Sequence, residues 1–369
     1  MLRLAPLLVL VALAHAPRTA PLELERLAPD LQLSSWIERP APGSAPPYAS
    51  GDKPNERSDG SDSDRGGLTG YGGSPLIVHA FAWDDKKSTE RVLPLMRDLL
   101  RANADRGLAV IGIADELLPD ARPEDRLAAE LNALSTHRVT YPVASADLGR
   151  SPSPYADGRN DAFVIGPNGA LLWRGDPIAA QKDLLDALGR AYERPHVAVL
   201  RRPLDAKLAR AESAYLAAEL KDALAKAKKL LKSKNSEAAA SARTVVNLVE
   251  STQWAWLEEL RKHAAGGPDL RYFELAEALR SALPKGEAAK ELEEIEKALK
   301  KEKLWRLRNQ DLTKWIELRR ERPALFPARK SKGGDAFAKE LEKFLRTTAN
   351  SNEATKEAKA LLERYAGGR

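Results

Sequence analysis

The 369-residue chain contains no cysteine. Without a thiol it cannot form a disulfide, use a thiolate as a nucleophile or bind a metal through sulfur. Its histidines are few, and none stands four residues from another on a predicted helix, the spacing typical of a zinc site. They are His15, His79, His137, His196 and His263. We therefore expect no bound metal and no cofactor.

Long apolar runs are also scarce, and the most apolar one lies at the N-terminus. Arg3 precedes the run Leu4 to Leu13, and Ala14-His15-Ala16 follows it as a small-residue cleavage site. This pattern predicts a signal peptide over residues 1–16, cleaved after Ala16. A membrane-spanning helix needs about 20 apolar residues, and no segment reaches that length. The sequence thus predicts an exported protein, periplasmic or extracellular, without stable membrane insertion.

Charge and composition divide the chain into parts. The formal net charge is +6, and the positive excess lies in residues 195–369. Residues 40–75 are rich in Pro, Gly, Ser and Asp, a composition that buries too little apolar area to fold and predicts a flexible insertion. We expect one domain over residues 27–194, containing this insertion, and a second over residues 195–369.

Residues 75–192 alternate between strand and helix patterns. The apolar runs 76–82 and 108–114 predict buried strands, and the segment between them has a single apolar helical face. Strand, helix and strand in this order indicate a parallel crossover unit. Residues 162–175 then predict a hairpin around Pro167-Asn168-Gly169, followed by a helix through Tyr192.

After Pro195 the strand patterns end, and segments rich in Ala, Leu, Glu and Lys predict helices joined by short loops. The predicted helices cover roughly 205–232, 235–265, 269–282, 286–309, 335–346 and 352–365. Antiparallel packing of such helices gives either a bundle or a short helical-repeat array, faintly similar to tetratricopeptide-type pairs.

Several segments of the first domain resemble the extracytoplasmic thioredoxin-like redoxin family of the TlpA/ResA and AhpC/TSA type. The matching segments are LAPDLQLSSWI (27–37), LIVHAFAW (76–83), Pro94, RGLAVIGIADE (106–116), YPVASAD (141–147) and the hairpin AFVIGPNGALLWRG (162–175). The resemblance covers less than half of the chain. It implies an α/β thioredoxin-like domain, with a central mixed sheet flanked by helices, ahead of the all-α domain.

The chemistry of that family requires Cys-x-x-Cys at the start of the helix after Trp83. Alignment on Trp83 places the two positions at Asp84 and Lys87, whereas alignment on Pro94 places them at Lys86 and Thr89. Neither alignment supplies sulfur. A facing cis-proline, also implied by the resemblance, corresponds to Asn160, where a trans peptide is expected because a non-proline cis bond costs about 2.5–4 kcal/mol. Thiol redox activity is therefore excluded.

Two further sets of residues are candidates for function. Asp84, Asp85 and Glu90, with Asp115 and Glu116, could form an acidic site at the ends of two strands, although aspartates at a helix N-terminus also need no function. In the helical half, Trp254, Trp256, Trp305 and Trp315, like Trp83 in the first domain, are candidate partner-binding residues. Core packing between helices is the favoured interpretation of the four in the helical half.

These observations predict an exported thioredoxin-like protein without catalytic residues that binds a protein or peptide, or serves as a scaffold, in the cell envelope. Nucleic acid is not an expected partner, because the lysines are interspersed with glutamates and no binding module is present. Two alternatives stay open. One is an enzyme of another class that uses the acidic residues near Asp84 and Asp115, and the other is a thiol oxidoreductase or peroxiredoxin family member by descent only.

Overall fold

The computed structural model describes most of the chain from Gly73 onward and two short stretches before it. The described residues are 24–29, 36–38, 73–146, 154–156, 160–193, 197, 200, 204–265, 269–283, 286–301, 303–327, 332–348 and 352–367. The predicted signal peptide and almost all of the predicted insertion at 40–75 lie outside these residues.

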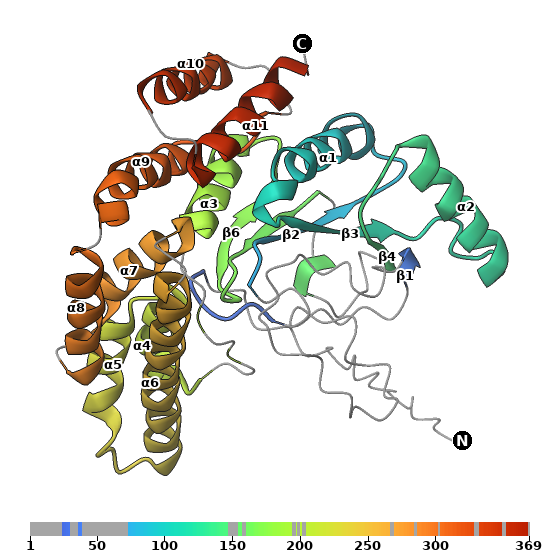
Figure 1. The fold of residues 1–369 in the computed structure, drawn as a ribbon. Coiled ribbons are helices and arrows are strands. Elements are labelled where there is room, and N and C mark those ends of the chain that lie inside the picture. The colour runs from blue at the N-terminus through green and yellow to red at the C-terminus, as the bar shows by residue number, and fades with distance from the viewer. Residues whose placement is uncertain are drawn as a thin grey trace, which may run out of the picture.

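A mixed sheet of six strands forms the first half of the molecule (Figure 1). The strands are β1 (Trp36–Glu38), β2 (Leu76–Phe81), β3 (Ala109–Asp115), β4 (Val143–Ala146), β5 (Ala162–Ile165) and β6 (Leu171–Gly175), in the order β1-β4-β3-β2-β5-β6. The neighbours β2, β3 and β4 are parallel, while β1, β5 and β6 pair in antiparallel fashion. Parallel neighbours require crossover connections, and helices supply them here.

Three helices belong to this sheet. A π-helical turn (Ser88–Val92) and α1 (Leu93–Ala102) connect β2 to β3, α2 (Pro123–Thr136) connects β3 to β4, and α3 (Gln181–Glu193) follows β6. The sequence predictions match β2, β3, α1, the β5–β6 hairpin and α3 within a few residues. The helix α2 was not predicted.

Both faces of the sheet are buried, which explains why its central strands are continuous apolar runs. In β2, Ile77 and Phe81 belong to the core on one face, and Val78 and Ala80 belong to the core on the other. The first core also contains the apolar residues of α1 and α3. The second packs against Tyr155, whose hydroxyl donates to the Pro29 carbonyl at 2.6 Å.

The second half of the chain is helical and lies beside the β5–β6 end of the sheet (Figure 1). Its helices are α4 (Ala209–Leu216), α5 (Leu220–Leu230), α6 (Ser236–Ala265), α7 (Leu270–Ala282), α8 (Glu287–Leu299), α9 (Lys303–Arg320), α10 (Lys332–Thr347) and α11 (Glu353–Gly367). Two predicted helices, 205–232 and 286–309, are each divided in two. No helix within the described ranges is long and apolar enough to span a membrane.

One hydrophobic core runs through both halves. The cluster that contains Ile77 of the sheet also contains Tyr215, Leu257 and Trp315 of the helical half. Polar contacts accompany it: buried Asn168, in the predicted hairpin turn, donates to the Leu216 carbonyl at 3.0 Å. The segments on either side of the predicted boundary at residue 195 therefore share one of the two cores, and the division into two domains stays a prediction.

Candidate functional site at the end of β2

The segment Asp84–Ser88 leaves the carboxyl end of β2 and starts the helix, which is the position where the sequence predicts a degenerate redox site. Asp85 organises this turn. Its carboxylate Oδ2 accepts the backbone N–H of Ser88 at 3.0 Å, and its carbonyl accepts the N–H of Thr89 at 3.0 Å. An aspartate that bonds a backbone N–H three residues ahead is a standard N-terminal helix cap, so this short sequence positions its own carboxylate.

Asn160 faces this turn from the neighbouring strand. It lies just before β5, which pairs with β2, and its backbone N–H donates to the Ala80 carbonyl at 3.2 Å. Its φ of 86° lies in the left-handed region that asparagine adopts more readily than most residues. The peptide bond before it involves Arg159, outside the described residues, so its trans geometry stays a prediction.

Asp85, Ser88 and Asn160 form one hydrogen-bond network. The Asn160 side-chain amide donates to Asp85 Oδ2 at 2.9 Å, and the Ser88 hydroxyl lies 2.9 Å from the same oxygen. The hydroxyl also contacts the Asn160 side-chain oxygen and accepts the Ala82 N–H at 3.2 Å. The hydrogen bonds from Asn160 and Ser88 lower the pKa of Asp85 to about 2. Asp85 is therefore an anion at neutral pH.

The network leaves little room for chemistry. Ser88 is fully buried, and its hydroxyl is held by three partners, so it is not presented to a substrate as a nucleophile. Beside it, Lys87 forms an ion pair with Asp176, which also accepts the N–H groups of Ile178 and Ala179 ahead of α3. These contacts tie the loop after β2 to the segment before β5 and to the segment before α3.

The structure shows which residues of the turn contact Asn160. The pair with Cys-x-x-Cys spacing that contacts Asn160 is Asp85 and Ser88, between the two predicted pairs. Asp84 and Lys86 are exposed, and Thr89 bonds back to Asp85. Sequence reasoning placed Asn160 opposite the turn but missed Asp85 and Ser88 as its partners. The available signal was Asp-x-x-Ser itself, since an aspartate three residues before a serine is a capping pattern.

Trp83 is partly buried and packs against residues of β2 and of the end of α2. Its ring stands edge-on to Phe81 at 4.8 Å and stacks on His137 at 6.1 Å between ring centroids. Its indole nitrogen is buried, and no described residue accepts its hydrogen. Trp83 therefore acts mainly as packing in this conformation.

The acidic alternative has no support in the geometry. Asp85 is occupied by Ser88 and Asn160, while Glu116 pairs with Arg126 at 3.2 Å. Within the described residues, no three histidine or carboxylate side chains come together as a group that could hold a metal ion. Asp85 after β2 and Glu116 after β3 thus have separate structural partners.

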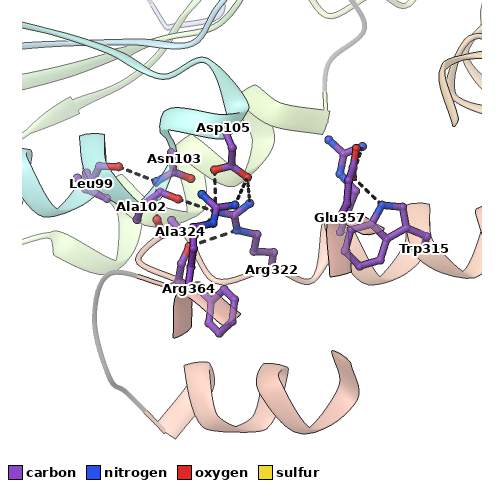
Figure 2. Close-up of polar contacts among 11 residues, drawn as sticks. Leu99, Ala102, Asn103, Asp105, Trp315, Arg322, Ala324, Glu357 and Arg364 are labelled. Atoms are coloured by element: carbon purple, nitrogen blue, oxygen red, sulfur yellow. Dashed lines mark hydrogen bonds and ion pairs between the residues drawn. The ribbon is translucent and has the colours of Figure 1, made fainter. Parts of the chain in front are cut away.

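The tryptophans of the helical half are mostly core residues. Trp315 is fully buried, and its indole donates to Glu357 at 2.9 Å (Figure 2). Trp256 is also buried, and Trp305 packs against Phe273. Trp256 and Trp315 therefore pack within the core in this conformation. Trp254 is 44% exposed and stays available for contact.

Comparisons with known proteins give matches of fold. No protein-family model matches the sequence, and a comparison with curated proteins found no relative. Among solved structures, the chain is similar to a thioredoxin-family thiol:disulfide interchange protein from Chlorobium tepidum (20% identity, 34% of this chain and 85% of that one, TM-score 0.27). It is also similar to the thioredoxin domain of a thiol-disulfide oxidoreductase from Bacteroides vulgatus (13%, 44% and 97%, 0.28). A thiol-disulfide isomerase from Corynebacterium glutamicum is a third (12%, 42% and 92%, 0.27).

The connectivity of the sheet itself defines the class of this domain. Parallel β2 and β3 joined through α1, followed by the antiparallel β5–β6 hairpin and α3, constitute a thioredoxin-like fold. The chain therefore combines a thioredoxin-like domain without cysteine and a helical half packed on the same core.

Proposed function

We propose that this is an exported, redox-inactive thioredoxin-like protein that binds a protein or peptide, or acts as a scaffold, in the cell envelope. The observation that carries the proposal is the Asp85–Ser88–Asn160 network. It occupies the turn where this fold class presents its reactive pair, and every polar group in it is engaged by another. A thioredoxin-like fold that has no reactive group at this turn supports binding rather than turnover.

Two other features support the same proposal. The pattern of residues 1–16 supports export. The helical half shares its core with the thioredoxin-like domain, so both present one rigid surface of the kind that a scaffold needs. The described surface includes Trp254 and the exposed leucines Leu118, Leu127 and Leu131.

The replaced-site part of the proposal is tested by restoring sulfur. The double variant D85C/S88C should form an intramolecular disulfide and gain disulfide-reductase turnover with a generic protein substrate. The matched control, D84C/K87C, has the same spacing but does not face Asn160, and should show at least about tenfold less activity. Equal activity in both variants, or no disulfide in D85C/S88C, would refute the placement of the replaced site.

The binding part is tested by crosslinking in cells that express the tagged full chain. Discrete crosslinked adducts, unchanged when a thiol reductant is added, are the expected result. A control of unrelated sequence with an intact thioredoxin site should give adducts that the reductant removes. If the protein gives no discrete adduct above that of an exported carrier protein, the proposed function is wrong.

A further inference from the structure

A pocket of about 140 Å³ lies away from the β2 loop, between the β1–β4 edge of the sheet and α2. Its lining includes Ile37, Glu116, Arg126, Leu127, Glu130 and Ser145. Sites for small organic ligands commonly measure about 300–1,000 Å³. This pocket is therefore better matched to a single side chain than to a cofactor-sized molecule.

Glu130 places a buried carboxylate in this pocket. The residue is 3% exposed, although it belongs to a helix that faces solvent. Its Oε1 accepts the Ser145 hydroxyl at 2.6 Å and the Leu117 N–H at 3.4 Å. No described residue donates a hydrogen bond to Oε2. The second oxygen of this carboxylate is therefore open to a donor from a ligand that enters the pocket.

The other charges of the pocket do not supply that cation. Arg126 is the basic residue of the lining, and its guanidinium is paired with Glu116 at 3.2 Å. The Glu116–Arg126 pair is neutral in sum, so the unbalanced charge is that of Glu130. The pocket thus complements one positive group, such as an ammonium or a guanidinium.

Three exposed leucines, called here the leucine rim, lie in the pocket lining or within a few residues of it in the chain. Leu127 lines the pocket and is 42% exposed, and Leu131, one helical turn further on, is 46% exposed. Leu118, next to Leu117, is 55% exposed and has a φ of 52°, a conformation unfavourable for leucine. Leu127 and Leu131, four residues apart, lie on one side of α2. Contiguous exposed apolar side chains mark contact surfaces for macromolecules.

We propose that the pocket and its leucine rim dock a segment of a partner protein that inserts one Lys or Arg side chain toward Glu130. Apolar residues beside that cation would cover Leu118, Leu127 and Leu131. This inference rests on the proposed binding function and specifies its surface and the chemistry of the partner. The Glu130 carboxylate supplies charge recognition, and the leucines supply apolar contact area.

The probe is a labelled peptide with one lysine among leucines, flanked by Gly and Ser, measured by fluorescence anisotropy on the full chain. The same peptide with norleucine in place of lysine keeps the apolar area and removes the charge. The lysine peptide should bind about tenfold or more tightly than the norleucine peptide. E130Q should remove that difference, since glutamine keeps the shape and the bond to Ser145 without the charge.

Two variants control the result. E124Q removes an exposed carboxylate from the same helix and should leave both affinities unchanged. L127S, at a half-exposed position, should weaken both peptides and lower the melting temperature only slightly, so it tests the rim even if E130Q folds poorly. Equal affinity for the two peptides, no binding of either, or no loss of affinity in L127S would overturn the inference.

Three further outcomes distinguish docking of a partner segment from self-association and from a failure of the proposed function. A concentration-dependent dimer that E130Q abolishes, seen by analytical ultracentrifugation, would assign the surface to a second copy of this chain and overturn the inference. If E130Q and L127S give the same crosslinked adducts in cells as the unmodified protein, the partner does not bind at this pocket, although the proposed function stands. If no form gives adducts, the function itself fails.

Discussion

His79 and Asp85 lie within a few residues of each other, yet acid affects them in different pH ranges. Burial lowers the pKa of His79 from 6.5 to about 3, because its ring is enclosed between Phe81 and Tyr141 in the central strand. Hydrogen bonds from Asn160 and Ser88 lower the pKa of Asp85 from 3.8 to about 2. Asp85 therefore stabilises the fold above about pH 4 and loses this effect as the pH falls toward 2.

His79 gives the clearer pH prediction. Between pH 6.5 and 3 the unfolded chain binds a proton at this residue and the folded chain does not. The free energy of unfolding therefore has its full value above pH 6.5 and decreases as the pH falls below 6.5. The decrease from this one group is at most about 1.4 kcal/mol per pH unit. Urea unfolding at pH 7 and pH 5 should show it.

The variant H79F removes the titrating group and keeps an aromatic ring of similar size. Above pH 6.5 its stability should be lower by about 1 kcal/mol, because Tyr141 loses the partner at 3.0 Å. Its dependence on pH between 6.5 and 4 should be weaker than that of the unmodified protein. H137N, which changes a histidine outside the sheet, is the control; if H79F and H137N show the same pH dependence, buried His79 is not the cause.

At the scale of elements, hydrophobic periodicity correctly predicted the helices and strands whose buried side is apolar. The strands β2 and β3, the hairpin and α1 follow this rule. The helix α2 does not, because it buries Glu130 and exposes Leu127 and Leu131. Its sequence pattern therefore resembles that of a connecting stretch. Because the buried residue is polar and the exposed ones are apolar, the sequence contains no sign of the pocket beside α2. The position of Asn160 opposite the turn was implied by the resemblance to the thioredoxin-like family, whereas its partners depend on the turn geometry.

The end of α2 allows a test of backbone strain. Arg138 has a φ of 54° at the position after the helix, where the Val139 N–H donates to the Leu134 carbonyl at 3.0 Å and the Arg138 N–H to Ser135 at 3.1 Å. Glycine is preferred in this helix-ending motif because it has no β-carbon. R138G should raise the free energy of unfolding by about 1 kcal/mol, measured by urea unfolding.

The opposite substitution serves as the control. Arg138 is exposed, so R138G loses no buried contact. R138V should lower stability, because a β-branched residue is strained further in the left-handed region. Similar effects of R138G and R138V would show that charge at this position, and not backbone conformation, determines the result.

At the scale of the whole molecule, buried polar residues join the two halves. Arg322, 7% exposed, bonds Asp105 with two nitrogens at 2.8 and 3.1 Å and also donates to the carbonyls of Ala102 and Phe326 (Figure 2). On the opposite side, buried Glu212 accepts from Arg26 at 2.9 Å and from the Leu204 N–H at 2.7 Å. Because these long-range contacts satisfy buried groups, the halves should unfold together.

Arg322 provides the test of this coupling. R322M removes a buried guanidinium with four acceptor atoms around it and should lower the free energy of unfolding by about 3 kcal/mol. Hydrogen exchange should increase in α1 and in α9 together. R320M, which removes an exposed pair with Glu277 at 2.8 Å, should cost less than about 1 kcal/mol. Exchange that increases only in α9 would contradict a shared folding unit.

The Glu212 contact also sets an order of events during synthesis. Its carboxylate holds the Leu27 N–H at 3.1 Å, across 185 positions of the chain. A ribosome that adds roughly 5–20 residues per second therefore releases the first segment many seconds before its anchor exists. The contacts of this segment with α4 can form only after that helix has emerged, so we expect a nascent chain stopped before α4 to be more sensitive to proteases than the full chain.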